Sequence, residues 1–159
     1  MESFAPSAPW ISGICAIAGT FQLPYPTESR WLERLSNPPD DLWQLVAVVD
    51  GRVVGLVVLV GNARTPARTH AAEVAIGVHD AWQGRGVGTA LMAAIVELAD
   101  NWLNVKRLEL SVFAENEAAR RLYERFGFVE EGRYRSYAFR NGRFVDAVSM
   151  ARLRGTAEP

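Results

Sequence analysis

The sequence is poor in the residues that build disulfides and metal sites, with one cysteine and two histidines among 159 residues. Cys15 has no partner for an internal disulfide, and a lone thiol is most often a small buried hydrophobic side chain. His70 and His79 lie apart in the chain without a motif partner. We therefore expect both histidines to be structural, and we predict no metal site.

The sequence also lacks a long apolar run, a basic leader and an excess of charge. No stretch approaches the roughly 20 apolar residues that span a bilayer, and residues 1–10 lack the basic segment of a signal peptide. The formal net charge is -1, which gives no reason to expect nucleic acid or an anionic membrane as a partner. These absences predict a cytoplasmic protein with no nucleic-acid or membrane partner.

Length and composition are those of one globular domain. Hydrophobic residues make up 49% of the chain and charged residues 22%, which suits a single core. There is no internal repeat, and no linker rich in glycine, serine or proline divides the chain. We expect one domain over residues 1–159.

The hydrophobic pattern changes period along the chain. Residues 10–17 and 27–35 are predicted as short helices around a loop with two prolines. Asp50-Gly51 and Asn141-Gly142 predict hairpin turns between β-strand patterns. The predicted strands cover residues 45–49, 53–60, 73–78, 107–113, 128–139 and 144–153, and two longer amphipathic helices cover residues 88–102 and 116–126. This order predicts an α/β fold with a mixed, mostly antiparallel sheet and helices on both faces.

A glycine-rich turn, Gln83-Gly84-Arg85-Gly86-Val87-Gly88-Thr89, stands between a predicted strand and an amphipathic helix. Its three alternating glycines remove side chains where the backbone must approach something closely. The first N–H groups of the following helix have no partner within the helix, and the helix dipole favours negative charge there. The turn therefore predicts a pyrophosphate site made of backbone amides, to which Arg85 adds a cation.

Three other interpretations of this turn fit less well. A Walker loop ends in Gly-Lys followed by Ser or Thr, whereas this turn ends in Gly88-Thr89-Ala90. A dinucleotide fingerprint needs a glycine at its sixth position, where Thr89 stands, although Glu109 lies where a ribose-binding acid would be. A tight turn without a ligand stays open as well, but such a turn does not explain the entropic cost of three glycines.

A second motif follows about thirty residues later, on the predicted helix over residues 116–126. Asn116 and Tyr123 are seven residues apart, so they project from nearly the same helix face. Gln-x-x-Gly-x-Gly at Gln83, followed by Asn-x-x-Ala-x-x-Leu-Tyr-x-x-x-Gly-Phe at Asn116, resembles the GNAT superfamily of acyl-CoA N-acyltransferases. The resemblance extends over residues 21–154, and residues 1–19 depart from it as an atypical start.

The resemblance implies a GNAT-type acyl-CoA N-acyltransferase fold, with acetyl-CoA as co-substrate. In that family the glycine turn binds the coenzyme A pyrophosphate, and the tyrosine that matches Tyr123 lies beside the sulfur. A thiol titrates at about 8.5 and a phenol at about 10, so a positioned phenol can donate a proton or a hydrogen bond to the departing sulfur. A core aromatic is the alternative role for Tyr123. The expected coenzyme-binding residues are Ile76, Gly77, Val78, Gln83, Gly84, Arg85, Gly86, Val87, Gly88, Thr89, Asn116, Ala119 and Arg120.

Glu73 is the candidate base, because an acid within the apolar run from Ala71 to Ile76 needs an explanation. An amine must lose its proton before it attacks, and a nearby carboxylate can accept that proton directly or through water. The alternative is a glutamate at a strand edge or in an ion pair with an arginine. The strand backbone around Gly77 is expected to pair with pantetheine and to polarise the thioester carbonyl.

The expected acceptor is a small primary amine, an amino acid or an analogue, which attacks directly in a ternary complex. The resemblance is nearest to the bacterial L-amino-acid N-acetyltransferases and their phosphinothricin-type relatives. A protein N-terminal or lysine acetyltransferase stays open, as does a non-catalytic acyl-CoA-binding module. Aromatic-rich hairpin ends favour a homodimer. The residues expected to line the acceptor pocket are Tyr25, Trp31, Tyr134, Tyr137 and Arg140, of which the last would meet a carboxylate.

Overall fold

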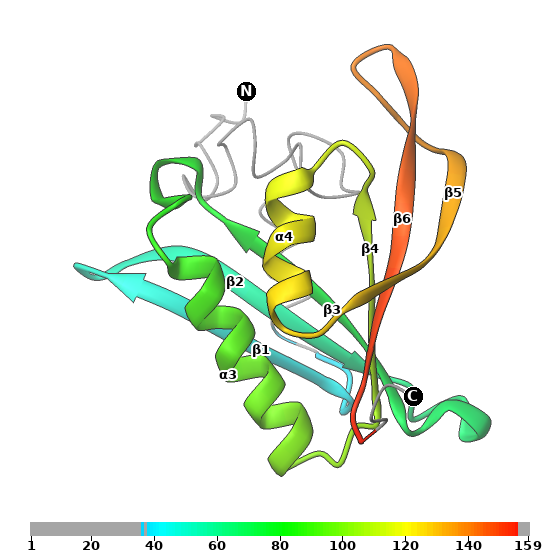
Figure 1. Ribbon diagram of the computed structural model, residues 1–159. Helices are drawn as coiled ribbons and strands as arrows, with labels where there is room; N and C mark the ends of the chain where they lie inside the picture. The colour runs from blue at the N-terminus through cyan, green and yellow to red at the C-terminus, as the bar shows by residue number, and fades with distance from the viewer. Residues whose placement is uncertain (1–35, 37, 156–159) are drawn as a thin grey trace, which may run out of the picture.

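The computed structural model describes residues 36 and 38–155, and all elements below belong to this part of the chain. The six predicted strands and the two longer helices are confirmed, and two short 3-10 helices join them (Figure 1). The helices predicted over residues 10–17 and 27–35 lie outside the described residues. In chain order the elements are β1 (Leu42–Val49), β2 (Arg52–Gly61), η1 (Pro66–Arg68), β3 (Ala71–Val78), η2 (Asp80–Trp82), α3 (Val87–Asn101), β4 (Arg107–Phe113), α4 (Glu117–Arg125), β5 (Val129–Arg140) and β6 (Arg143–Leu153).

The strands form one sheet in the order β1-β2-β3-β4-β6-β5, in which β3 and β4 are parallel and the other neighbours are antiparallel. This confirms the mixed, mostly antiparallel sheet. Both predicted hairpin turns are present: Asp50 and Gly51 have φ of 49° and 73°, and Asn141 and Gly142 have φ of 49° and 76°. Two successive positive φ values are what a type I′ turn requires, and Asp-Gly and Asn-Gly adopt them readily.

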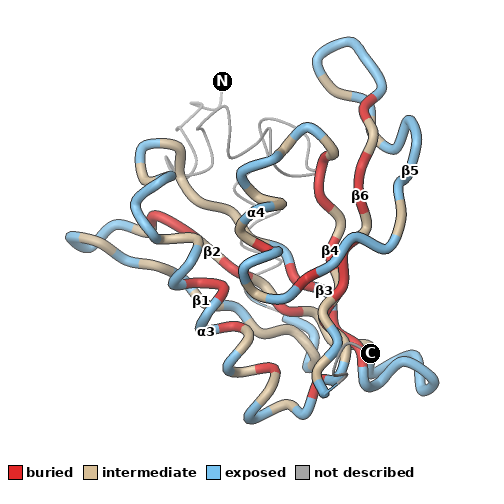
Figure 2. The backbone as a smooth tube through the Cα atoms, viewed as in Figure 1, coloured by how far each residue is buried: buried red, intermediate tan, exposed pale blue. Residues whose placement is uncertain are grey.

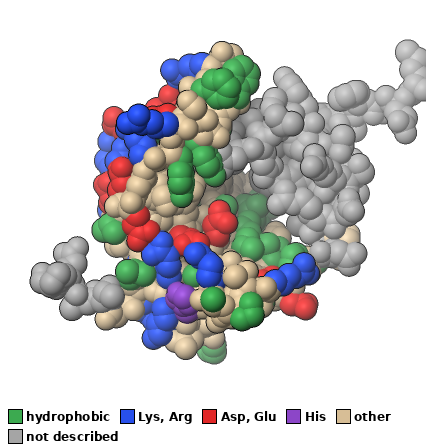
Figure 3. Space-filling model, turned by 90° about the vertical axis from the view of Figure 1, so that its right-hand side faces the viewer, with side chains coloured by type: hydrophobic (Ala, Val, Ile, Leu, Met, Phe, Trp, Pro, Cys, Tyr) green, Lys and Arg blue, Asp and Glu red, His purple; other side chains and the backbone are tan. Residues whose placement is uncertain are grey.

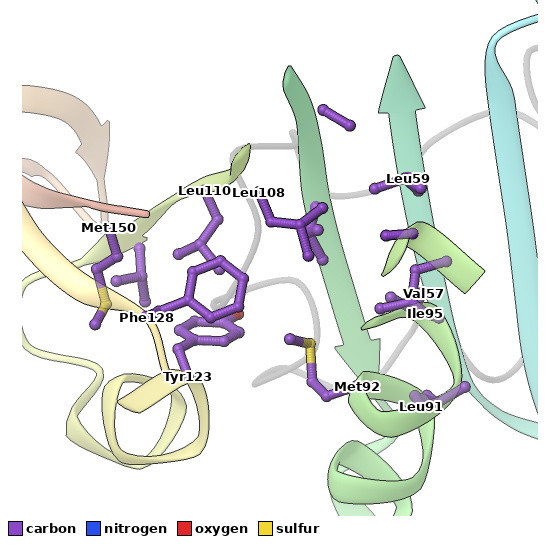
Figure 4. Packing of buried hydrophobic residues seen from close by; sticks show 14 of the residues in the cluster. Val57, Leu59, Leu91, Met92, Ile95, Leu108, Leu110, Tyr123, Phe128 and Met150 are labelled. Carbon is purple, nitrogen blue, oxygen red and sulfur yellow. The ribbon is translucent and has the colours of Figure 1, made fainter. Parts of the chain in front are cut away.

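The core lies between the sheet and the two helices α3 and α4, which cover the same face (Figures 1 and 4). Side chains alternate along each strand, so one residue in two points to the helices. Figure 2 shows the buried stretches in the central strands and on one side of α3, whereas β5 is largely exposed. Our prediction of helices on the second face concerns residues outside the described part. Neither α3 nor α4 is long and apolar enough to cross a membrane.

The sheet opens between its two central strands. β3 and β4 pair over only three residues each, Ala71–Glu73 with Arg107–Glu109. Beyond these pairs β3 stays with β2 as far as Val78, and β4 stays with β6 as far as Phe113. Residues 74–78 of β3 and 110–113 of β4 therefore diverge, as Figure 1 shows. We call this opening the splay.

The direction of the hydrogen bonds at the two ends of β3 shows which backbone groups face the splay. His70 O accepts from the N–H groups of Lys106 and Arg107 on the β4 side. His79 N–H donates to Val54 O on the β2 side. Because main-chain groups alternate in direction along a strand, the groups of the even-numbered residues point towards β4. The N–H and C=O groups that face the splay are therefore those of Val74, Ile76 and Val78.

A half-buried ion pair fastens the far end of α3 to the sheet. Arg152 of β6 donates to both carboxylate oxygens of Asp100, at 2.8 and 2.7 Å, and the two side chains are 20% and 19% exposed. We expect Asp100→Ala to lower the free energy of unfolding by about 2 kcal/mol, because it leaves a poorly hydrated guanidinium unpaired. Urea denaturation measures this loss.

The matched control is the exposed pair on α4. Glu117 and Arg121 are 73% and 68% exposed, with 3.1 Å between their charged atoms. Glu117→Ala should cost no more than about 1 kcal/mol, because water screens that pair. Equal losses for the two variants would show that the Asp100 pair does not fasten α3.

Candidate active site

The glycine turn leads into α3, and the first backbone amides of this helix have no hydrogen-bond partner among the described residues. The N-cap of α3 is Gly86, which has no side chain to cap the helix. The first helical amide with a described main-chain partner is that of Ala90, which donates to Gly86 O at 2.9 Å. The N–H groups of Val87, Gly88 and Thr89 are left as donors at the positive end of the helix dipole. This is the arrangement that the sequence predicts for an anion site.

The backbone requires two of the three glycines, and helix packing requires the third. Gly84 and Gly86 have φ of 70° and 83°, a region that residues with a Cβ rarely adopt. A Cβ on either would meet no described atom within 4 Å, so the space in front of them is open. A Cβ on Gly88 would lie 3.2 Å from Leu122 Cδ2 of α4. Gly88 therefore allows close contact between the start of α3 and α4.

Side chains from the turn itself and from α4 contact the glycine turn and the start of α3. Gln83 Nε2 donates to Val78 O at 3.3 Å and to Asp80 Oδ1 at 3.2 Å, which ties the turn to the end of β3. The guanidinium of Arg85 lies over the Trp82 ring, 5.1 Å from its centroid. Arg125 of α4 donates to Thr89 Oγ1 at 3.3 Å. The start of α3 thus has arginine side chains beside it from two elements.

α4 begins and ends as predicted. Asn116 Oδ1 accepts from Ala119 N–H at 3.2 Å and caps the helix, while its amide NH₂ has no described partner. Gly127 has φ of 82° and follows the last helical turn. Arg120 donates to Glu130 at 3.0 Å, but its Nε is buried and unpartnered among the described residues. The start of α4 therefore has two polar groups, the Asn116 amide NH₂ and Arg120 Nε, without a hydrogen-bond partner among the described residues.

Tyr123 is buried in the core with a hydroxyl that makes no hydrogen bond to the described residues. The side chain is 7% exposed, and its ring centroid lies 6.0 Å from that of Phe128. Figure 4 shows it beside Phe128 and close to Leu110. Burial raises the pKa of Tyr123 to about 12. The phenol is therefore protonated, and a donor, throughout the neutral range.

The opposite face of the sheet is hollowed where β3, β4, β6 and β5 meet. The cavity has a volume of about 550 Å³, and we call it the hollow. Acidic and basic side chains gather around this part of the surface (Figure 3). Its lining consists of Arg68, Glu73, Arg107, Glu109, Leu110, Ser111, Glu131, Gly132, Arg133, Tyr134 and Ser149.

Glu73 is the last β3 residue that pairs with β4, so it stands at the vertex of the splay. Its neighbours Ala72 and Val74 are buried in the core, and the alternation of the strand turns Glu73 into the hollow. Among the described residues it has no ion pair and no side-chain hydrogen bond. The alternative of an arginine partner for Glu73 is therefore not found in this part of the chain.

The two neighbouring acids of the hollow are paired. Arg107 Nε donates to Glu109 at 2.8 Å, and Arg107 Nη1 donates to Glu131 at 3.0 Å. Arg68 forms a further ion pair with Glu109. Hydrogen bonding to Arg107 lowers the pKa of Glu131 below its ordinary value. Of the three carboxylates that the described residues place in the hollow, only that of Glu73 has no ion pair with a described residue.

The structure brings some of the predicted acceptor residues to the hollow and not others. Tyr134 lines it and stacks on Tyr137, with 5.1 Å between ring centroids. Arg140 does not line it: its guanidinium lies 4.7 Å from the centroid of Phe113 and 3.6 Å from a carboxylate oxygen of Glu115. The Arg140 guanidinium thus contacts Phe113 and Glu115 and does not face the hollow. The remaining candidates, Tyr25 and Trp31, lie outside the described residues.

A three-residue bulge in β5 presents the two stacked tyrosines. Tyr134 pairs with Ala147 and Ala138 pairs with Val145, so residues 135–137 loop out of the ladder. Asp146 holds the bulge by accepting from Ser136 N–H at 2.9 Å and from Arg133 Nε at 3.0 Å. These two donors lower the pKa of Asp146. The stacking of Tyr134 on Tyr137 thus depends on a bulge that no pattern in the sequence predicts.

The predicted structural role of one histidine is observed. His79 Nδ1 accepts from Ala81 N–H at 3.2 Å and caps η2. Among residues 38–155 no three His, Cys, Asp or Glu side chains gather as a metal site would require.

Sequence reasoning missed the arginine and glutamate network of the hollow. A signal was present, because Arg107 and Glu109 alternate with Leu108 and Leu110 along one strand and must share the face opposite the core. The link to Glu131 carried no signal. It depends on a bulge between Glu130 and Gly132, where β5 shifts its register against β6.

Comparison with known proteins agrees with this geometry. The acetyltransferase (GNAT) family model matches residues 11–128. The L-amino acid N-acetyltransferase AaaT of Escherichia coli strain K12 is 45% identical over 85% of this chain and 82% of its own length. The phosphinothricin N-acetyltransferase of Streptomyces coelicolor is 32% identical over 79% of this chain and 74% of its own.

The fold comparison gives the same result. The crystal structure of a GNAT family acetyltransferase from Streptococcus pneumoniae superposes with a TM-score of 0.69 at 28% identity, over 79% of this chain and 74% of that one. The family match spans β1 to α4 and includes the glycine turn. The chain belongs to the acetyltransferase (GNAT) family and is an N-acetyltransferase.

Proposed function

We propose that this enzyme transfers the acetyl group of acetyl-CoA to the primary amine of a small zwitterion, an amino acid or an analogue, by direct attack in a ternary complex. The observation that carries the proposal is the splay. Glu73 borders it from the hollow, and Tyr123 belongs to the core cluster on the other face of the sheet. A group lying in the splay can therefore meet a proton acceptor on one side and a hydrogen-bond donor on the other.

The residues around the splay fit a coenzyme A thioester. The bare amides at the start of α3, the open space before Gly86 and the guanidinium of Arg85 suit a pyrophosphate. The backbone groups of Ile76 and Val78 suit the amides of pantetheine, as in an added strand. When bound, acetyl-CoA supplies the activated acetyl group.

The coenzyme assignment is tested at Gly86. We expect Gly86→Ala to weaken coenzyme A binding at least about tenfold, because a Cβ would occupy the space before the amides. The matched control is Gly51→Ala in the β1–β2 turn, where φ is 73° and a Cβ also meets nothing within 4 Å. Both variants should lose about 1–2 kcal/mol of stability from the same backbone strain. Calorimetry would oppose the assignment if both bound coenzyme A equally well.

The side chains have separate roles in the proposed reaction. The Glu73 carboxylate takes a proton from the acceptor ammonium and leaves a nucleophilic amine. A main-chain N–H of the splay polarises the carbonyl. Tyr123 hydrogen-bonds to the departing sulfur. Because burial raises the phenol pKa to about 12, Tyr123 is protonated at neutral pH and can donate to the sulfur as it departs.

The charge of the hollow supports a zwitterionic acceptor. The described part of its lining has three glutamates and three arginines, so their formal charges cancel. A polyamine carries several positive charges and would be favoured by an excess of acid, which this lining lacks. An amino acid offers one charge of each sign. The similarity to an L-amino acid N-acetyltransferase supports the same class.

Thiol release from acetyl-CoA, measured across amino acids, polyamines, antibiotics and peptides, tests the function. The proposal predicts that amino acids or their analogues give the highest kcat/KM. Turnover confined to peptides would indicate a protein acetyltransferase. Coenzyme binding without release on any amine would indicate a binding module.

We also propose a single domain, a homodimer and a cytoplasmic location. A single domain is supported by one sheet and one core cluster within residues 38–155. A homodimer is supported by Phe139 and Phe144, which are 64% and 67% exposed at the hairpin end, and sedimentation velocity would test it. A cytoplasmic location can be checked by cell fractionation.

A further inference from the structure

We propose that Ser111, Ser149 and Gly132 form the subsite for the side chain of the acceptor, and that Gly132 sets the largest side chain that fits. The inference rests on the proposed function, which places the acceptor amine at Glu73. It adds a specificity determinant on the strands farther from the splay. The carrying observation is a row of small residues across three strands inside the hollow.

The strand register creates this row. Ser111 of β4 pairs with Ser149 of β6, and Ser149 pairs on its other side with Gly132 of β5. Residues directly opposite one another project from the same face of a sheet. All three line the hollow, with Glu73 on one side of the row and Tyr134 on the other. We call these three residues the floor of the hollow; their short side chains leave space above the sheet for a ligand.

The space in front of Gly132, which follows the Glu131 bulge, is open. The φ of this residue is not in the left-handed region, and a Cβ built on it would meet no described atom within 4 Å. By contrast, a Cβ on Gly55 would lie 2.9 Å from Leu91 Cδ1, so packing explains that glycine. A glycine inside a strand costs roughly 0.5–1 kcal/mol relative to alanine, and it often marks a bulge or a place where a ligand approaches. What Gly132 contributes is room within the hollow.

The hydroxyl groups give the subsite its chemical character. Neither Ser111 nor Ser149 makes a side-chain hydrogen bond to a described residue, and each hydroxyl can both donate and accept. Glu131, the extra residue of the bulge, has its carboxylate bound by Arg107. The floor thus offers neutral, two-way hydrogen bonding. It suits the side chain of a small or polar amino acid.

Size selection is tested with Gly132→Ala and Gly132→Val, since valine suits an extended strand. Acceptors of rising volume, from glycine through methionine to phenylalanine, are compared by kcat/KM. We expect Gly132→Val to lower the ratio of large to small acceptors at least about tenfold, while KM for acetyl-CoA changes less than about twofold. Val129→Leu is the control, because it adds bulk on the same strand outside the hollow. It should leave the ratio unchanged.

The proposed hydrogen bond between the Ser149 hydroxyl and the acceptor side chain is tested separately. Ser149→Ala should lower kcat/KM for threonine about tenfold relative to its isostere valine, because an acceptor hydroxyl loses its partner. Equal losses on both acceptors would overturn that role.

Two failures can be told apart. If the wild-type enzyme acetylates no amino acid, the proposed function fails and the subsite fails with it. If the wild type does acetylate amino acids, and a folded Gly132→Val that binds coenzyme A keeps the wild-type size ratio, only the subsite is wrong.

Discussion

Glu73→Gln is expected to lower kcat about 10²-fold near neutral pH, while coenzyme A affinity stays within about twofold of the wild type. Glutamine keeps the shape of the side chain but cannot accept a proton from the acceptor ammonium. The loss should shrink as the pH rises. As the pH approaches the pKa of the acceptor ammonium, the acceptor loses its proton to solvent without help. The measurement is a pH profile of kcat and kcat/KM for both enzymes.

The control for this experiment is Glu97→Gln, the same chemical change at an exposed site on α3. It should leave the profile unchanged, because it removes a solvated charge away from the hollow. A loss in Glu73→Gln that is the same at every pH would contradict the base role. It would indicate that Glu73 positions the acceptor by its charge alone.

Tyr123→Phe is expected to lower kcat by about 10²-fold or more without weakening coenzyme binding. The hydroxyl makes no hydrogen bond to the described residues, so its loss should leave the core packed while removing the donor for the departing sulfur. Because the phenol pKa is about 12, the wild-type kcat should show no fall from tyrosine ionisation below about pH 11. An unchanged kcat in the variant would remove Tyr123 from the mechanism.

Tyr123 should also make the free energy of unfolding depend on pH in the alkaline range. In the unfolded chain the phenol titrates at about 10, whereas burial raises its pKa to about 12 in the folded state. As pH rises, the unfolded chain loses its proton first, so the stabilising contribution is complete below pH 10. It is lost progressively towards pH 12, by roughly 2–3 kcal/mol. Tyr123→Phe lacks this term, and its melting temperature should fall less steeply above pH 10.

Local signals predicted the parts of the site that local chemistry determines. Asn116 caps α4 because its side chain reaches an amide three residues on, and Gly127 ends the helix because it tolerates a positive φ. The bare start of α3 follows in the same way from Gly86. Such features need only a few neighbouring residues, so the sequence contains them in full.

Features that depend on register between distant strands could not be predicted. The sequence marks Glu73 as an unusual acid, but its place at the vertex of the splay depends on where β3 leaves β4. The tie between Arg107 and Glu131 depends on a bulge, as does the stacking of Tyr134 on Tyr137. The surroundings of Arg140 depend on the fold as well. As a residue type it suits a carboxylate ligand, and the fold sets it against Phe113 and Glu115.

The splay also bears on how the protein avoids aggregation. An exposed strand edge invites strands of other chains, and proteins usually protect such edges. Here the unpaired backbone of β3 and β4 lies in the middle of the sheet, between strands that are paired on their outer sides and beneath α4 (Figure 1). A slender, extended molecule can thread into such an opening, whereas a β-strand of a second protein, with its own sheet attached, cannot. The enzyme can thus keep strand-pairing groups ready for a coenzyme without offering them to its neighbours in a crowded cell.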